Sequence, residues 1–416
     1  MSNHDKYDII IIGGGISGLY SAYKILKMAP KTRLLVLERY KKHWLGGRLG
    51  NVMFQGTMVV SGAGIGRKEK DYLLIDLLRE MKIPYTDFQI SHNYAKTVHP
   101  PCNVKKIIYI LKKELKETPD LRSSKTFKEF ALPILGADLY KHFTICSGYT
   151  DYENADVYDT LYNYSFDDNY GSWTGLHIPW AQLIDEISKK VGSKNIRVSS
   201  NVTDIEVVSP CNFVVHTDKN VSYSCDKVIL ATTISSVLKL IPGASEKNSI
   251  YQQIQGQPFL RLYGKFSKSS IPIMKEYVNG QTIVSGPLKK IIPMDSDKGV
   301  YMIAYTDNAD AKSLKDHLEN NTENRAYFCE LLESSLGIPK DTLHLNAILD
   351  FYWPIGTHYY KPLSSQFKNR KEFIKKAQNP MPGMLVVGEM ISLNQGWTQG
   401  ALESVESVVT KKWVDC

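Results

Sequence analysis

The sequence has 416 residues, of which 43% are hydrophobic and 23% are charged, and its formal net charge is +8. This length exceeds the usual size of one hydrophobic core, so we expect two domains with a ligand able to lie between them. No apolar run approaches the roughly 18 residues that span a bilayer, which argues against a transmembrane anchor. The positive charge is spread over lysine-rich segments without interleaved aromatic residues, and this pattern argues against a nucleic-acid-binding protein.

The ends of the sequence and the cysteines indicate an intracellular protein. The first residues, MSNHDKYD, lack the basic and apolar regions of a signal peptide, and the last, TKKWVDC, match no membrane anchor. The six cysteines, at 102, 146, 211, 225, 329 and 416, lie far apart and show no spacing typical of a metal site or a redox dithiol. We therefore expect reduced thiols, no bound metal and a cytoplasmic location. If the composition rich in Lys, Asn, Ile and Tyr reflects a viral source, that location is the host cytoplasm or the virion.

The first predicted element is a buried strand that runs into a glycine-rich turn. Residues 7–12 (YDIIII) form a β-prone apolar run, as expected of a central parallel strand. Gly13, Gly15 and Gly18 follow, and a helix is predicted that begins with Ser17. In a dinucleotide-binding turn the first glycine permits the tight turn, the second lets backbone amides approach a pyrophosphate, and the third allows close helix–strand packing. The amino terminus of the helix adds the positive end of its dipole.

A second predicted strand, residues 32–38 (TRLLVLE), ends on Glu38, about 20 residues beyond the turn. A carboxylate at this distance can accept hydrogen bonds from both hydroxyls of an adenosine ribose, and it would repel a 2′-phosphate. Strand, glycine turn, helix and acid agree on a dinucleotide-binding unit. Its predicted ligand contacts come from Gly13, Gly15, Ser17, Gly18, Glu38 and the adjacent Arg39.

The residues after this acid distinguish a flavin from a nicotinamide nucleotide. The segment LGGRLG, residues 45–50, is followed by SGAGIG, residues 61–66, and with these segments the chain resembles the flavin-containing amine oxidase family, which includes the monoamine and polyamine oxidases. The resemblance implies FAD as the cofactor. It also implies that the first segment neutralises the FAD diphosphate and that the second passes close to the isoalloxazine ring. The residues implied for these contacts are Gly47, Arg48, Gly62 and Ala63.

A second block with the same resemblance lies near the carboxyl terminus, at residues 384–409. It reads as an apolar strand, a loop that contains Glu389, and a helix that begins near Thr398. It is similar to the closing motif of the family, where such a helix points its amino terminus at the N1/C2 carbonyl edge of the flavin. Free amides and the helix dipole there stabilise the negative charge that develops on reduction. The resemblance therefore implies Glu389, Trp397 and Thr398 as further cofactor contacts.

The middle of the chain resembles the family more loosely. Residues 173–191 correspond to a strand and helix of the family, 196–207 to the strand pair after them, and 225–241 to the strand that returns to the nucleotide domain. Val202 corresponds to a residue whose backbone meets adenine. We therefore predict an α/β fold with an interrupted Rossmann-like FAD-binding domain and an inserted α+β substrate-binding domain. The predicted boundaries are 1–90, 195–250 and 375–416 for the FAD-binding domain, and 91–194 and 251–374 for the substrate domain.

In this family an amine lies over the flavin, and a hydride equivalent passes from its α-carbon to flavin N5 in an apolar, dehydrated pocket. Two aromatic side chains commonly flank the donor nitrogen. Trp397 corresponds to one of them. The other is expected from residues 352–363 (YWPIGTHYYKPL), where His358, Tyr359 and Tyr360 are the candidates. Ordinary core packing is the alternative for each of these side chains.

The same segment bears on how the cofactor is held. Monoamine oxidases attach FAD through a cysteine at this place, whereas residues 356–358 of this chain are Gly-Thr-His. The resemblance therefore implies FAD that is bound without a covalent link.

A further departure from the family concerns a lysine near flavin N5 that many members carry on a strand. In this chain the segment QPFLRLYGKFSK, residues 257–268, puts Arg261 in that place, with Lys265 out of phase. Arginine keeps the charge but is bulkier and practically never neutral. Either it pairs with a local acid as a structural salt link, or it binds an anionic substrate group such as a carboxylate. The second alternative would favour an amino acid over a simple amine.

The sequence thus predicts an FAD-dependent oxidase that converts an amine or amino acid to an imine and passes the electrons to O₂, which gives H₂O₂. Two alternatives stay open: a flavin desaturase or dehydrogenase of the protoporphyrinogen or carotene type, and a non-catalytic flavin-binding structural protein. The expected partners are a small-molecule substrate and O₂, and a homodimer is left open. The residues expected at the reacting face are Trp397, Arg261, His358 and Tyr360.

Overall fold

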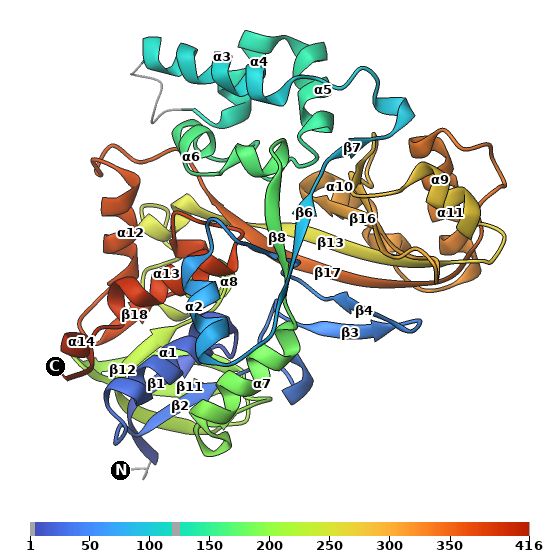
Figure 1. Cartoon of the computed structure of the whole chain (residues 1–416). Coiled ribbons are helices and arrows are strands. Elements are labelled where there is room, and N and C mark those ends of the chain that lie inside the picture. Colours follow the sequence, from blue (N-terminus) through green and yellow to red (C-terminus); the bar gives the residue numbers. More distant parts are fainter. Residues whose placement is uncertain (1–4, 119–124, 416) are drawn as a thin grey trace.

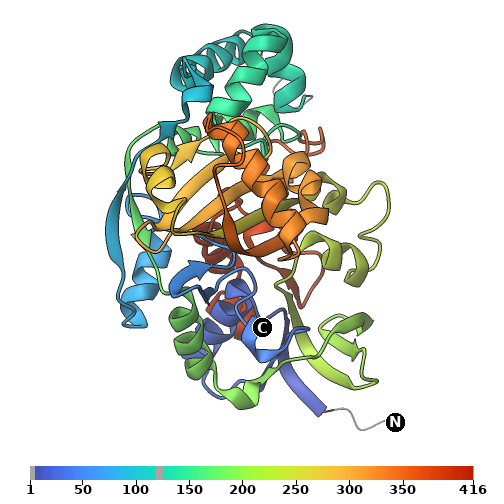
Figure 2. The same ribbon diagram turned by 90° about the vertical axis from the view of Figure 1, so that its right-hand side faces the viewer.

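The structure is a computed structural model that describes residues 5–118 and 125–415 (Figure 1). A mostly parallel sheet lies at one end of the molecule, a second sheet crosses its middle, and a group of helices covers the other end (Figures 1 and 2). This arrangement confirms the predicted α/β fold class. Within the described ranges, no helix is both long enough and apolar enough to cross a membrane.

The first sheet has the strand order β10–β11–β12–β1–β2–β9, with β18 paired to β12. Its strands are β1 (Asp5–Ile12), β2 (Leu34–Leu37), β9 (Ile196–Arg197), β10 (Val202–Ser209), β11 (Asn212–Thr217), β12 (Ser222–Leu230) and β18 (Met384–Val386). β1 pairs in parallel with both β2 and β12, and it contains the strand predicted over residues 7–12. The isoleucines of β1 alternate between two separate cores, one on each face. Strands from the two ends of the sequence therefore meet in one sheet.

Helices cover both faces of this sheet. One face carries α1 (Ile16–Met28), α2 (Tyr72–Glu80), α7 (Trp180–Val191) and α13 (Thr398–Val408), and the other carries α8 (Ile234–Leu240) and α12 (Arg370–Gln378). The helix predicted after the glycine turn is present, and the helix predicted near Thr398 begins at that residue.

The position of α7 corrects one predicted boundary, which puts residues 91–194 in the substrate domain. Leu183 and Ile187 of α7 share a core with Ile25 of α1, so this helix belongs to the first sheet. The reason is physical: an amphipathic helix carries one apolar stripe in its sequence, but that stripe does not say which sheet it faces.

The second sheet has the strand order β17–β13–β16–β15–β14–β7. Its strands are β7 (Asn93–Tyr94), β13 (Ile254–Phe266), β14 (Thr282–Ile283), β15 (Lys290–Asp295), β16 (Val300–Asp307) and β17 (Leu345–Tyr360). Neighbouring strands are antiparallel except for β14 and β7. β13 and β17 stay paired from Ile254 opposite Tyr360 to Phe266 opposite Leu345, so they form one long surface across the middle of the molecule (Figure 1).

The remaining elements surround these two sheets. Helices with buried apolar faces pack on the second sheet or extend beyond it: α3 (Val104–Glu117), α4 (Phe127–Leu135), α5 (Ala137–Cys146), α6 (Val157–Tyr162), α9 (Ile271–Tyr277), α10 (Asn308–Ser313) and α11 (Thr322–Leu336). A three-stranded sheet of β5 (Gly66–Arg67), β8 (Trp173–His177) and β6 (Thr86–Ile90) runs between the first sheet and the helices α3 to α6 (Figure 1). The hairpin of β3 (Asn51–Phe54) and β4 (Thr57–Val60) and the terminal helix α14 (Lys411–Asp415) complete the chain.

The fold also brings together two cysteines that the sequence separates. The N–H of Cys102 donates to Sγ of Cys146 at 3.0 Å, and His142 lies beside them, with one ligand-type atom of each side chain within 4.8 Å of the others. The spacing of the cysteines does not indicate this cluster, because α5 and the loop before α3 meet only in the folded chain. Cys416 lies outside the described residues.

Candidate active site

One large cavity, about 1340 Å³ in volume, opens between the first and second sheets. Most small-molecule pockets have roughly 300–1,000 Å³, so this space is large enough for a dinucleotide together with a substrate. Most of the predicted site residues line it, although they come from both ends of the chain. These are Gly13, Gly15, Ser17, Glu38, Arg39, Gly47, Arg48, Gly62, Ala63, Val202, Arg261, Glu389, Trp397 and Thr398.

The glycine turn is tightly packed on one side and open on the other. Gly13 has φ +108°, a conformation that favours glycine. A Cβ on Gly18 would overlap the carbonyl oxygen of Gly13, so Gly18 lets α1 approach β1. A Cβ on Gly15 would meet no atom closer than 4.0 Å, because Gly15 faces the cavity. Gly15 is also the N-cap of α1 and provides no side-chain cap, which leaves the first N–H groups of the helix for an anionic ligand.

Glu38 follows β2 and holds the glycine turn in place. Its Oε2 accepts the N–H of Gly14 at 2.6 Å, and its Oε1 accepts the N–H of Tyr40 at 2.8 Å. A carboxylate has about four acceptor sites, so the same group can accept further hydrogen bonds from ribose hydroxyls. Arg39 lies at the rim, where its guanidinium carbon is 4.5 Å from the ring centroid of Tyr40.

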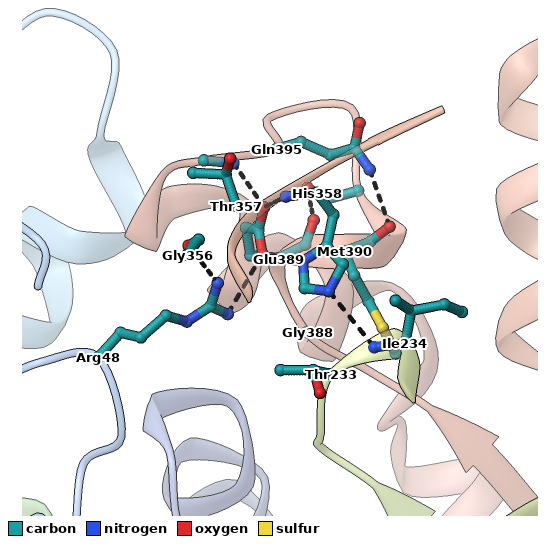
Figure 3. A network of polar contacts seen from close by, with 12 residues as sticks. Arg48, Thr233, Ile234, Gly356, Thr357, His358, Gly388, Glu389, Met390 and Gln395 are labelled. Atoms are coloured by element: carbon teal, nitrogen blue, oxygen red, sulfur yellow. Dashed lines mark hydrogen bonds and ion pairs between the residues drawn. The ribbon is translucent and has the colours of Figure 1, made fainter. Parts of the chain in front are cut away.

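Arg48 and Glu389 join distant parts of the chain into one wall of the cavity (Figure 3). Nη1 of Arg48 donates to the carbonyl oxygen of Gly356 at 2.6 Å, and Nη2 is 3.2 Å from Oε2 of Glu389. The N–H of Ala63 donates to the carbonyl oxygen of Arg48 at 2.8 Å. A Cβ on Gly62 would overlap that oxygen, so the two glycine-rich segments pack directly against each other.

Glu389 is a buried carboxylate with several donors around it (Figure 3). Its Oε1 accepts the N–H of Gly396 at 2.8 Å and the N–H of His358 at 3.1 Å, and its Oε2 lies 2.8 Å from Nδ1 of His358. Because Nε2 of His358 accepts the N–H of Ile234 at 3.3 Å, the pattern assigns the proton to Nδ1. Burial alone would raise the pKa of Glu389, but His358, Arg48 and these hydrogen bonds lower it to about 2. Glu389 is therefore a carboxylate that positions Arg48 and the loop before α13.

Trp397 is the N-cap of α13 and lines the cavity. Its ring centroid lies 3.8 Å from the guanidinium carbon of Arg67, and Trp173 meets it edge-on at 6.3 Å. Arg67 is 1% exposed and pairs with Asp71 and Asp168, so a fixed cation supports the indole. No side chain caps α13, and its first N–H groups are left for a ligand at this end of the cavity.

His358 and Tyr360 lie outside the lining of the large cavity, which corrects the expectation that one of them faces the substrate. The His358 side chain is fully buried beside Glu389. The Tyr360 hydroxyl donates to the carbonyl oxygen of Ser392 at 3.0 Å. Together with Tyr359, they border a separate small cavity of about 50 Å³. The consecutive residues 353–357 of β17 line the large cavity, and the strand has left it by His358; the sequence alone does not show where a strand leaves a cavity.

Residues that carry no motif complete the other end of the large cavity. Trp353, from the segment expected to supply the second aromatic, lines it, and so do Tyr149, Phe259 and Tyr305. The Tyr305 ring lies 5.0 Å from Phe259 and 5.6 Å from Tyr149. These rings form an aromatic wall at this end of the cavity. Trp353 and Phe259 lie in segments that resemble the family, whereas Tyr149 and Tyr305 lie outside the segments compared with it.

Two basic side chains reach this aromatic end. Nη2 of Arg261, on β13, donates to the Tyr305 hydroxyl at 3.0 Å. Lys290, at the start of β15, is 1% exposed, and its Nζ lies 3.3 Å from the ring centroid of Tyr149. Burial lowers the pKa of Lys290 to about 7, against the attraction of two nearby carboxylates. In the part of the chain that the structure describes, no carboxylate forms an ion pair with Arg261, which removes the alternative of a structural salt link.

One cavity brings together the glycine turn, the carboxylate of Glu38 and the uncapped starts of α1 and α13. The aromatic wall of Tyr149, Phe259, Tyr305 and Trp353 lines the same cavity. Together with the sheet order, these features define the class of dinucleotide-dependent α/β oxidoreductases.

Comparisons with known proteins support this class. The family model described as flavin containing amine oxidoreductase matches residues 110–409. A redesigned triple mutant of putrescine oxidase superposes with a TM-score of 0.75 at 14% identity, covering 99% of both chains. Wild-type putrescine oxidase bound to putrescine gives a TM-score of 0.73 at 14% identity, covering 97% of this chain and 98% of that one.

Two curated proteins are similar in sequence. An uncharacterized protein of Acanthamoeba polyphaga mimivirus is 22% identical, over 99% of this chain and 94% of its own length. Thiamine thiazole synthase of Fusarium vanettenii is 32% identical over 24% of this chain and 26% of its own length.

The chain belongs to the flavin-containing amine oxidoreductase family, because the family model matches well over half of its length. It is a flavin-dependent oxidoreductase, as the sequence predicts. The likeness to the solved structures supports the fold.

Proposed function

We propose that this protein binds FAD without a covalent link and uses it to oxidise an amine or amino acid to the imine, with O₂ as the acceptor and H₂O₂ as the second product. The observation that carries the proposal is the single cavity that joins the uncapped start of α1 to the uncapped start of α13. Family membership supports a flavin and an amine. A cytoplasmic location stays a prediction.

The residues present fit an adenine dinucleotide. Gly15 leaves an open cradle where a side chain would intrude, and the N–H groups of α1 would hold the pyrophosphate there. Glu38 would accept the ribose hydroxyls, Val202 would border the adenine, and Arg48 would add positive charge beside the diphosphate. Among the described residues, no cysteine lines the cavity, in keeping with a non-covalent cofactor.

The reacting face would lie between Trp397 and the aromatic wall that contains Trp353 and Tyr305. Bound FAD would supply the electron acceptor: two electrons and a proton leave the carbon next to the amine nitrogen, a second proton leaves the nitrogen, and O₂ finally takes up the two electrons and two protons to give H₂O₂. The chain itself orients the amine and excludes water. His358 acts as a positioning residue through Glu389, and Tyr360 packs behind the loop that precedes α13.

The test is anaerobic mixing of the purified holoprotein with a panel of amines and amino acids. We expect at least one of them to bleach the visible flavin band, and readmitted O₂ to restore it with release of H₂O₂. Bleaching by none of them would contradict amine oxidation, and would favour a flavin desaturase or a non-catalytic flavoprotein.

A further inference from the structure

Six lysine and arginine side chains in the described part of the protein are buried, and they differ in what compensates their charge. Arg67, Lys289 and Arg370 form ion pairs, and Lys227 donates to the carbonyl oxygen of Val414 at 2.8 Å. Arg261 and Lys290 have no carboxylate within ion-pair distance among the residues that the structure describes, and both line the large cavity. A buried cation without an anionic partner is costly, so a ligand is the natural source of the missing charge.

The present contacts of these two side chains are with neutral groups. The Arg261 guanidinium donates to the Tyr305 hydroxyl and to Sδ of Met302, which leaves several of its five N–H donors unused. Lys290 faces the Tyr149 ring, and no described atom accepts a hydrogen bond from its Nζ. Both cations are therefore available to a ligand that enters the cavity.

The two cations lie near each other, because both approach the Tyr305 ring and the charge of Arg261 helps to lower the pKa of Lys290. The guanidinium carbon of Arg261 lies 4.1 Å from the Tyr305 ring centroid, and Nζ of Lys290 lies 5.9 Å from the same centroid. Arg261 also touches the loop predicted to pass close to the flavin ring, since a Cβ on Gly64 would lie 3.1 Å from its Nη2. An anion held by this pair would therefore sit beside the reacting face.

The nearest carboxylates are Asp307 and Asp151, and Asp151 also lines the cavity. Neither forms an ion pair with Arg261 or Lys290, and both accept hydrogen bonds from other groups. Asp307 accepts hydrogen bonds from the N–H and hydroxyl of Thr150 and from the N–H of Asp151. Asp151 accepts the hydroxyl of Tyr164 at 2.6 Å, and burial together with the charge of Asp307 raises the pKa of Asp151. Because two buried carboxylates so close together resist ionising at once, they provide less than two negative charges. A bound anion would favour the charged form of Lys290.

We infer that the substrate carries an anionic group, a carboxylate in the simplest case, in addition to its amine, and that Arg261 and Lys290 bind this group. The inference rests on the proposed amine oxidation and narrows it to amino acids or other amines that carry an anion.

Binding of non-oxidisable probes to the holoprotein tests the inference without turnover. Calorimetry would compare butanoate with butanamide, which has the same shape without the charge. We expect butanoate to bind at least about 10-fold more tightly, and K290Q to weaken it by about 10- to 100-fold, as for loss of one charge-assisted hydrogen bond.

The matched control is K289Q, because Lys289 is also buried but pairs with Asp310 at 3.0 Å and does not line the cavity. It should leave butanoate affinity unchanged, which separates loss of the anion site from general damage to the fold. Equal affinity for butanoate and butanamide, or an equal loss in K289Q and K290Q, would overturn the inference.

Turnover measurements then distinguish failure of the anion site from failure of the proposed amine oxidation. If 4-aminobutanoate or another amino acid reduces the flavin better than butylamine and K290Q removes this preference, the inference is supported. If butylamine is oxidised as well as the amino acids, the inference fails while amine oxidation stands. If butanoate binds but no amine of any kind reduces the flavin, the anion site stands and the proposed function fails.

Discussion

Trp397 stands at the N-cap position of α13 in the wall of the cavity, and the buried guanidinium of Arg67, which pairs with Asp71, lies against its ring. A ring that is fixed in this way can orient a small substrate, because its position is set before the ligand arrives.

W397A should lower kcat/KM by about 100-fold, because the substrate loses its orienting wall, while the flavin content stays unchanged. Steady-state kinetics and the flavin-to-protein ratio measure the two quantities. W413A is the control, since Trp413 lies near Lys227 and away from the cavity. A parallel loss of flavin and activity would make Trp397 a packing residue.

Glu389 gives a residue-scale prediction about pH. Its pKa is lowered from 4.5 to about 2, so its contribution to the free energy of unfolding is complete above about pH 4.5 and is lost as the pH falls toward 2. E389Q should therefore destabilise the protein by on the order of 3 kcal/mol at pH 7 and by much less near pH 2.5. Denaturant titrations at both pH values measure the difference. An equal difference at both would show that the charge of Glu389 contributes nothing.

At the scale of elements, the start of α1 separates packing from ligand binding. Gly18 is needed for the contact between α1 and β1, whereas Gly15 borders only the cavity. Gly15 and Gly18, three residues apart, therefore have different roles. Substituting each one alone distinguishes an effect on ligand binding from an effect on packing.

G18A should destabilise the protein by on the order of 3 kcal/mol, because its Cβ overlaps the Gly13 carbonyl group. G15A should change the stability of the flavin-free protein by less than about 0.5 kcal/mol, since its φ of −72° suits any residue, but should weaken FAD binding by more than about 10-fold. Thermal unfolding of the flavin-free protein and FAD titration check both. Normal FAD affinity in G15A would place the pyrophosphate elsewhere.

The elements also show what the sequence could predict. β1, the glycine turn and α1 are contiguous, so their pattern is readable within about 30 residues, and the same holds for β18 and α13. Lys290, Tyr149 and Tyr305 could not be predicted, because each comes from a different element and joins the site only through sheet pairing and loop packing. The resemblance to the family indicates Arg261, but it does not indicate its partner Tyr305.

At the scale of the whole molecule, residues that lie nearly 400 positions apart in the sequence line the same cavity. β1 and β18 are both neighbours of β12, and the turn after β1 and the start of α13 line the same space. The helices α3 to α5 lie at the opposite end of the molecule (Figure 1).

FAD added to the flavin-free protein should therefore slow amide hydrogen exchange at residues 13–18 and 396–402 together, since a ligand stabilises every region that it contacts. Exchange in α3 should change little. Protection at one end of the chain alone would mean that the two ends do not share a ligand.

The most direct measurement is the absorbance spectrum of the purified protein, followed by denaturation and identification of what is released. The account predicts a yellow protein that yields about one FAD per chain into the protein-free filtrate. A colourless protein that takes up no FAD on reconstitution, or a flavin that stays with the denatured chain, would contradict it.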